Sequence, residues 1–206
     1  MHGLRRVSGL PPTRSALERY KSRVCGGEKV ITKNLALTAI FAALYAVLVI
    51  ALAGISFQLV QVRVADALIP LSMVFGWPAV AGVTIGCVIS NIVSPLPSVI
   101  TDITLGALAN FCASLAAWRI GLWKQQRASD MVVRVGSHLV TRDRLSHFLG
   151  CLAATLVVTF VVGTYLAVIT TMELWIWWLG IGIGSLISIC GIGYPLVEVF
   201  RRIQLH

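Results

Sequence analysis

The sequence lacks the motifs of the common catalytic sites. It has no G-x-x-x-x-G-K-[ST] phosphate loop, which excludes ATP hydrolysis by that route, and neither G-x-S-x-G nor H-E-x-x-H. Its five cysteines form neither an even disulfide framework nor a C-x-x-C pair, and its four histidines fall in the tails or in the basic stretch over residues 119–147. We therefore expect no enzyme activity, no metal site and no cofactor.

Charged residues are scarce as well. They make up 12% of the 206 residues, against 57% apolar residues, and the mean hydropathy is +0.87. A soluble domain carries roughly twice that share of charge. The net charge of +9 raises the question of a nucleic-acid partner, but the basic residues flank apolar spans and no recognition motif accompanies them. The composition predicts a protein of the lipid bilayer with no nucleic-acid partner.

Six apolar segments are candidates for transmembrane helices, because a helix rises about 1.5 Å per residue and a bilayer core is about 30 Å thick. Gly76-Trp77-Pro78 separates the second segment from the third, since a helix would have to kink or stop there. The second segment is short for a full crossing, so we expect it to be tilted or to share its span with the loop before it. The predicted spans are residues 35–53, 65–75, 78–93, 98–118, 145–169 and 174–200.

The basic residues predict the orientation of these spans. All 17 Lys and Arg residues except Arg63 lie in residues 1–33, in residues 119–147 or at Arg201 and Arg202. An excess of basic residues marks cytoplasmic segments, and only an even number of crossings places all three blocks on that side. The predicted fold class is therefore all-α, an integral membrane protein with six transmembrane helices and with both termini cytoplasmic.

The same pattern predicts the organisation of the chain. Residues 1–33 form a basic cytoplasmic tail, residues 34–203 a membrane domain, and residues 119–147 a basic cytoplasmic loop. The glycines of the tail, Gly26 and Gly27 among them, are expected to prevent one continuous helix there. A cleaved secretory signal is a competing interpretation of the first apolar span, because Ala51-Leu52-Ala53 resembles a cleavage site.

Polar residues gather at the outer membrane face that this orientation defines. Ionisable groups at membrane depth are unfavourable unless they are paired or face a wet cavity, so such a set suggests a binding site open to the exterior. Asp102 stands near the start of a helix, with Gly106 and Asn110 following at i+4 and i+8 on one face. The alternatives are a pairing of Asp66 with Arg63, a helix cap by Asp102 and a solvated Glu173. The candidate site residues are Gln61, Arg63, Asp66, Asn91, Asp102 and Glu173.

Alanines in the first span predict a contact surface for another helix. Ala39 pairs with Ala43, and Ala42 with Ala46, at the spacing that lets two helices approach closely in lipid. Packing within the chain explains such a stripe equally well.

The stretch from Ile55 to Leu68, ISFQLVQVRVADAL, resembles the loop and second helix of QueT-type membrane proteins. These are the queuosine-precursor substrate-binding subunits (S components) of energy-coupling factor (ECF) transporters. The resemblance continues through Gly86-Cys87, Asn91, Asp102 and Gly106 and covers about residues 34–118 well. The family more often has Glu where Asp66 stands, so the class of transporter is better defined than its ligand.

The resemblance implies a six-helix subunit that captures a small molecule, a 7-deazaguanine, from outside. Its first-helix alanines would dock on a transmembrane coupling subunit that is driven by two ATPase subunits. A carboxylate, Asp102 or Asp66, would accept the donor edge of the base, and Arg63, Gln61 or Asn91 would donate to its carbonyl. A cationic aminomethyl arm would draw a second carboxylate. The alternatives are an S component for another vitamin-like molecule and an oligomeric channel or structural membrane protein.

Overall fold

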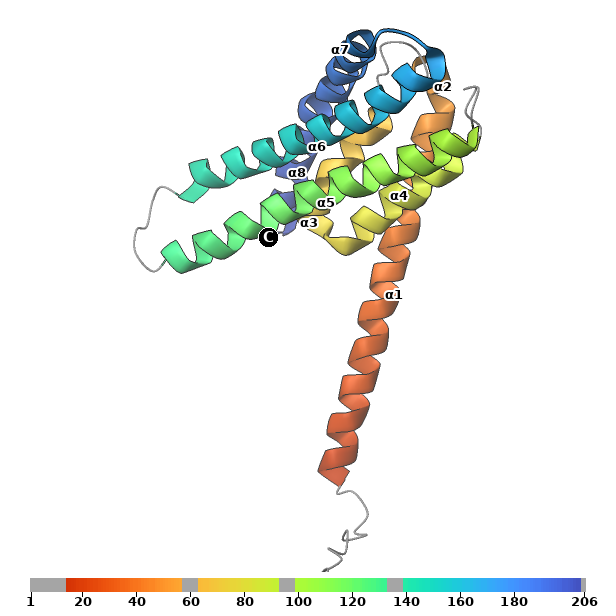
Figure 1. The fold of residues 1–206 in the computed structure, drawn as a ribbon. Coiled ribbons are helices and arrows are strands. Elements are labelled where there is room, and N and C mark those ends of the chain that lie inside the picture. Colours follow the sequence, from red (N-terminus) through yellow and green to blue (C-terminus); the bar gives the residue numbers. More distant parts are fainter. Residues whose placement is uncertain (1–13, 57–62, 93–98, 133–138, 205–206) are drawn as a thin grey trace, which may run out of the picture. The chain divides into compact units, whose positions relative to one another are not determined.

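The computed structural model describes residues 14–56, 63–92, 99–132 and 139–204, and the elements in these ranges are helices (Figure 1). Four of them are long and apolar enough to cross a membrane, at Val30–Ala51, Ile100–Leu122, Leu145–Thr170 and Leu174–Ile203. Two shorter apolar helices, Val64–Phe75 and Trp77–Asn91, lie between the first and second of these in sequence. The six segments lie where the six spans were predicted.

The chain divides into two units, Met1–Ala36 and Leu37–His206, and the packing described below is that of the second unit. Two spans contain irregular helix, since η1 in the second span is a 3₁₀-helix and η2 in the last span is a π-helix. The elements are α1 (Arg14–Ala51), α2 (Ala53–Ser56), η1 (Val64–Leu71), α3 (Ser72–Phe75), α4 (Trp77–Asn91), α5 (Val99–Val132), α6 (Leu139–Thr170), α7 (Leu174–Ser185), η2 (Leu186–Gly193) and α8 (Tyr194–Gln204).

Two segments that the sequence predicted to lack continuous helix are helical. Helix α1 begins at Arg14 and runs through Gly26 and Gly27, so the expected break in the tail is wrong. A glycine disfavours a helix interior by about 1 kcal/mol relative to alanine, which a 38-residue helix can absorb. Similarly, α5 continues to Val132 and α6 begins at Leu139, so most of the predicted loop over residues 119–147 is helix. The end of an apolar span marks the end of the lipid contact and not the end of the helix.

The break between the second and third predicted spans is confirmed. Gly76 separates α3 from α4 with φ +66°, a left-handed conformation that glycine adopts without strain. Helix α4 then begins at Trp77 with Pro78 in its first turn, where the missing N–H of proline has no helical partner to lose.

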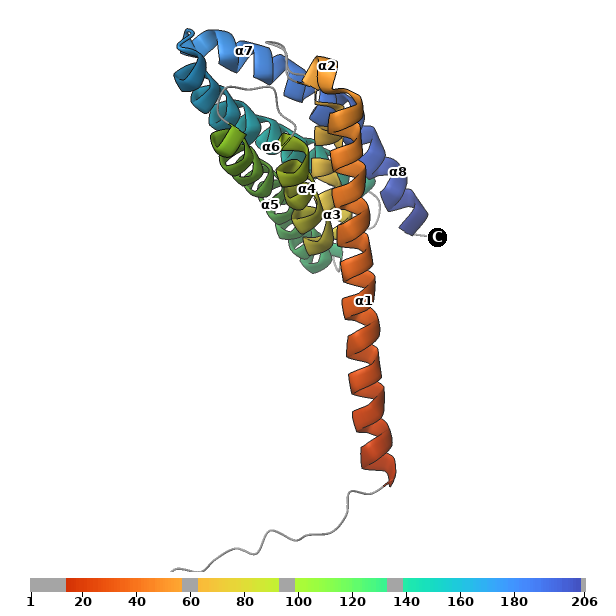
Figure 2. The same cartoon turned by 90° about the vertical axis from the view of Figure 1, so that its right-hand side faces the viewer.

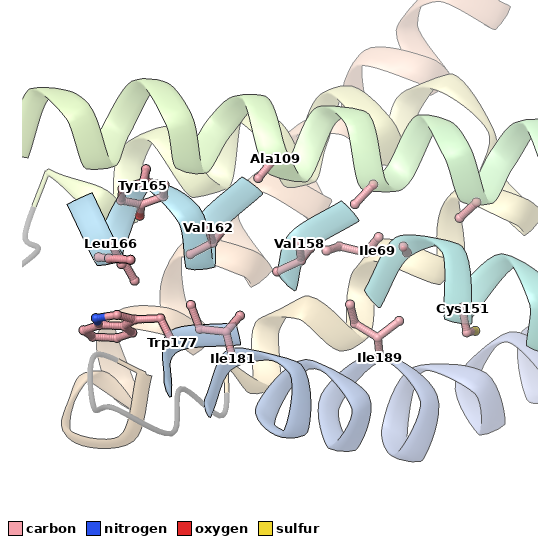
Figure 3. Close-up of a cluster of buried hydrophobic side chains, with 14 residues drawn as sticks. Ile69, Ala109, Cys151, Val158, Val162, Tyr165, Leu166, Trp177, Ile181 and Ile189 are labelled. Carbon is pink, nitrogen blue, oxygen red and sulfur yellow. The ribbon is translucent and has the colours of Figure 1, made fainter. Parts of the chain in front are cut away.

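The core of the second unit lies between neighbouring helices that run side by side. In Figures 1 and 2, α5 lies along α6, with α4 next to α5 and α7 next to α6. Figure 3 shows Val158 and Val162 of α6 facing Ile181 and Ile189 of the last span. Helix α5 contributes small, fully buried residues to the same cluster, and they allow α5 to lie close to α6: Ala109, Ala113 and Ala117.

Helix η1 lies inside the helical assembly. Every residue from Ala65 to Leu71 is buried, and η1 packs against η2 of the last span. A Cβ atom at Gly193 would lie 2.9 Å from the carbonyl oxygen of Ala67, so the backbones of η1 and η2 touch there. The short second span is therefore enclosed by protein, which permits its irregular backbone at membrane depth.

Helix α4 packs on α1 through glycines. A Cβ atom at Gly86 would lie 2.7 Å from the Ala42 carbonyl oxygen and 2.7 Å from Cβ of Tyr45. Gly82 similarly faces Phe41 and the carbonyl oxygen of Thr38. The buried Ala42 and Ala46 lie on this inner side of α1, which leaves Ala39 and Ala43 exposed.

We predict that Gly86→Ala lowers the free energy of unfolding in detergent by about 1–3 kcal/mol, because the added methyl group overlaps the α1 backbone. Gly191→Ala is the matched control, since a Cβ atom there meets nothing within 4 Å. Thermal unfolding of the purified variants measures both effects. Equal melting temperatures for the two variants would contradict the tight α1–α4 contact.

Candidate binding site

Residues 34–118 contain three side chains that are charged at neutral pH, Arg63, Asp66 and Asp102. All three are buried, with exposed fractions of 5%, 2% and 0%. Arg63 precedes η1, Asp66 lies in the first turn of η1, and Asp102 lies in the first turn of α5. Burial of a charge is strongly unfavourable unless polar groups surround it, so the partners of these side chains matter.

Asn91, the last residue of α4, connects Arg63 to Asp102. Nη2 of Arg63 donates to Oδ1 of Asn91 at 3.0 Å, and Nδ2 of Asn91 donates to the backbone carbonyl of Asp102 at 3.0 Å. Gly106 makes room for this amide, because a Cβ atom there would lie 2.5 Å from Nδ2 of Asn91. The second, third and fourth spans therefore meet at one side chain.

A tyrosine holds each of the two carboxylates. The hydroxyl of Tyr45 in α1 donates to Oδ1 of Asp66 at 2.6 Å. The hydroxyl of Tyr165 in α6 donates to Oδ1 of Asp102. We call the six side chains the buried polar network: Tyr45, Arg63, Asp66, Asn91, Asp102 and Tyr165.

The network contains more negative than positive charge. With both carboxylates ionised, one guanidinium and two carboxylates sum to −1. Neither residues 57–62 nor residues 93–98, which lie outside the described ranges, contain an ionisable side chain. An unbalanced buried charge is unfavourable by several kcal/mol, so a network of this composition favours a cationic ligand.

One oxygen of the network is available to another molecule. Oδ2 of Asp102 is fully buried and has no hydrogen-bond partner among the residues that the structure describes. Buried carboxylate oxygens are nearly always hydrogen-bonded, so an uncommitted one in a buried network suggests a ligand or water position. The arrangement suits the binding of a molecule that presents N–H groups or a cation.

The structure brings together four of the six residues predicted from the sequence: Arg63, Asp66, Asn91 and Asp102. Gln61 lies outside the described residues. Glu173 is exposed and lies immediately before α7. Asp102 is three residues inside α5, and its carboxylate accepts a hydrogen bond from Tyr165, which argues against a simple helix cap.

The sequence did not single out Tyr45 and Tyr165. Both lie in long apolar spans, where a tyrosine resembles an ordinary aromatic core residue. The available signal is the hydroxyl, because a buried phenol needs a hydrogen-bond partner and lipid provides none.

We predict that Asn91→Ala lowers the free energy of unfolding by about 2–3 kcal/mol, because it removes the amide that accepts from Arg63 and donates to the Asp102 carbonyl. Ser90→Ala is the neighbouring control, since the Ser90 hydroxyl donates only within its own helix turn, to the Cys87 carbonyl at 3.1 Å. Denaturation in detergent compares the two. A loss no larger than that of the control would show that Asn91 does not hold the network together.

Comparison with known proteins identifies the family of this chain. A family model described as the QueT transporter matches residues 35–202, which is most of the chain. No curated protein and no solved structure matches. The match extends the resemblance carried by residues 34–118 across the last two spans, and it makes the protein a multi-pass membrane transport protein and not an enzyme. The chain belongs to the QueT transporter family.

Proposed function

We propose that this protein is the substrate-binding subunit of an ECF importer and that it captures a queuosine or archaeosine precursor, a 7-deazaguanine, from outside the cell. The membership of the QueT transporter family supports transport, and the buried polar network supports a small polar ligand. The observation on which the proposal most depends is the uncommitted Oδ2 of Asp102.

The hydrogen-bonding groups of a 7-deazaguanine match those of the network. Its N1–H and exocyclic amine form an edge of donors, which one carboxylate accepts with both oxygens. Asp102 suits this role, because Tyr165 fixes the orientation of the carboxylate and leaves Oδ2 uncommitted. The carbonyl of the base needs a donor, and Arg63, the cation among the six side chains of the network, can supply one, because it donates to Asn91 through Nη2 and has further N–H groups.

The charge of the network favours one form of the ligand. Two carboxylates and one guanidinium accommodate one additional positive charge without an unbalanced remainder. A precursor with a cationic aminomethyl arm supplies that charge, whereas a precursor with a neutral nitrile does not. Asp66, held by Tyr45, is the second carboxylate for the arm.

We also infer which side of the subunit faces the cytoplasm and which partner subunits it binds. Both termini and the basic segment at residues 119–147 would face the cytoplasm, following the bias of basic residues. A transmembrane coupling subunit and two ATPase subunits would supply the energy, in keeping with the missing phosphate loop in this chain. The coupling subunit would dock on Ala39 and Ala43, which are exposed, and not on the buried Ala42 and Ala46.

Ligand binding by the purified protein tests the proposed substrate. We expect 7-aminomethyl-7-deazaguanine to bind and the 7-cyano compound to bind at least about tenfold more weakly, as expected when a charged pair is lost. Asp102→Asn should weaken binding by about 10- to 100-fold, and Glu173→Gln, which alters the exposed acid, should leave it unchanged. Isothermal titration calorimetry gives the affinities.

Two results would contradict the proposed substrate or its site. If neither deazaguanine binds while the protein is folded, the substrate assignment is wrong. If both bind and Asp102→Asn has no effect, the ligand lies away from the buried polar network.

A second prediction concerns the docking surface. Replacing Ala39 and Ala43 with Trp should abolish co-purification of the coupling subunit while ligand affinity stays at the wild-type value, because these side chains point away from the network. Val168→Trp, on an exposed position of α6, is the control for added bulk. Retention of the coupling subunit by the double Trp variant would exclude this face of α1.

A further inference from the structure

The buried charges of the membrane domain do not balance when no ligand is bound. Arg63, Asp66 and Asp102 are the buried charged side chains in the described part of the chain. Printed bonds connect them, because Asn91 joins Arg63 to the Asp102 carbonyl, and the backbone N–H of Asp66 donates to the Arg63 carbonyl at 2.9 Å. With both carboxylates ionised, one negative charge would remain buried, which is strongly unfavourable.

The other titratable groups close to these charges are neutral. The network contains the phenols of Tyr45 and Tyr165, and the thiol of Cys87 in α4 lies 3.6 Å from Nδ2 of Asn91. Helix η2, which packs against η1, adds the thiol of Cys190. Phenols and thiols are ordinarily uncharged at pH 7, so none of these groups supplies a positive charge.

Basic side chains elsewhere on the elements that pack against η1 form no ion pair with either carboxylate in the described structure. On α5, Arg119 is 17 residues from Asp102, which is about 25 Å along the helix axis. On α6, His147 precedes the tyrosine that bonds Asp102 by 18 residues. The arginines of α8 lie in its last turn, where Arg202 pairs with Glu198. The missing positive charge must therefore come from a ligand or from a proton.

The two carboxylates differ in what stabilises their negative charge. Asp102 lies in the first turn of α5, an α-helix of 34 residues, and the positive end of a helix dipole favours an ionised carboxylate. Asp66 lies in η1, a 3₁₀-helix of eight residues, in which far fewer peptide dipoles are aligned. A proton is therefore held more readily at Asp66 than at Asp102.

We propose that the side chain of Asp66 carries a proton in the ligand-free protein and gives it up when a cationic ligand binds. This inference rests on the proposed function and adds a proton exchange to it. The O–H bond of the Asp66 carboxylic acid breaks, the proton passes to a base of the buffer, and the ammonium group of the ligand replaces it as the balancing charge. A neutral precursor leaves the proton in place, so Asp66 distinguishes the two forms of the ligand.

Proton release makes the affinity depend on pH. A ligand that displaces a proton binds more tightly as the pH rises, by up to about tenfold per pH unit while the free protein still holds the proton. The ligand itself keeps its charge in this range, because an alkylammonium group has a pKa of about 10. We expect the affinity for 7-aminomethyl-7-deazaguanine to rise between about pH 5.5 and 7, and the affinity for the 7-cyano compound to stay constant.

Calorimetric titration of the full chain in detergent counts the protons when it is repeated in buffers of different ionisation enthalpy. The wild type should release about one proton per bound aminomethyl compound at about pH 6, and none per bound cyano compound. Asp66→Asn keeps an oxygen for the Tyr45 hydroxyl but has no proton to lose. It should release none, bind the aminomethyl compound about tenfold more weakly and bind the cyano compound as the wild type does.

Glu173→Gln is the matched control, because it removes an exposed carboxylate. Its proton release and its preference for the aminomethyl compound should equal those of the wild type. Proton release that persists in Asp66→Asn would place the proton on the ligand or on another residue and would overturn the role of Asp66.

The remaining outcomes separate this inference from the function on which it rests. Binding of the aminomethyl compound by the wild type without proton release would overturn the proton exchange and leave the proposed substrate intact. Should Asp66→Asn fail to fold, the wild type decides alone, since an equal pH dependence of both affinities would contradict the exchange. No binding of either compound by the folded wild-type chain would overturn the substrate and this inference together.

Discussion

The burial of Arg63, Asp66 and Asp102 is the constraint on which the rest of this structure depends. Because the three side chains are buried, bulk water cannot solvate their charges, and each must obtain its hydrogen bonds from other parts of the protein. Tyr45 comes from α1, Asn91 from α4 and Tyr165 from α6, and they meet residues of η1 and α5. Five elements are thus tied together by polar contacts at one place, in a protein whose remaining contacts are mostly apolar.

The irregular helices η1 and η2 lie next to each other, and η1 contains Asp66 of the buried polar network. Helix η1 adopts the 3₁₀ form, which rises about 2.0 Å per residue against about 1.5 Å in an α-helix, and every residue from Ala65 to Leu71 is buried. The last span contains the π-helix η2 opposite it, and Gly193 lets the two backbones touch. π-helical segments are common at functional sites, and this one packs against η1, which follows Arg63 and contains Asp66.

Helix α1 has two faces with different tasks. Its inner face holds Tyr45, which bonds Asp66, and Ala42, which receives Gly86 of α4. Its outer face exposes Ala39 and Ala43. Under the proposed function, one helix therefore contacts the ligand-binding residues on one side and the coupling subunit on the other.

The sequence alone determined the class of protein and the positions of its spans. Hydropathy and the Gly76-Trp77-Pro78 break located all six segments, because a membrane requires long apolar stretches and because Gly and Pro interrupt helices in predictable ways. Charged residues are scarce between residues 34 and 118, so the sequence also singled out Arg63, Asp66 and Asp102 as candidate site residues. Helix ends were less predictable, since α5 continues beyond the apolar span into polar residues that also favour helix.

Only the tertiary structure decided which of these residues are partners. Tyr45 and Tyr165 lie 21 and 63 residues from the aspartates that they bond, so no local pattern connects them. The stripe of small residues in α1 divides into an inner and an outer half only when α4 is packed against it. Likewise, Asn91 and Asn110 are the same residue type, but Nδ2 of Asn91 donates to the Asp102 carbonyl, whereas Nδ2 of Asn110 has no partner among the described residues, because hydrogen bonding depends on which helices meet.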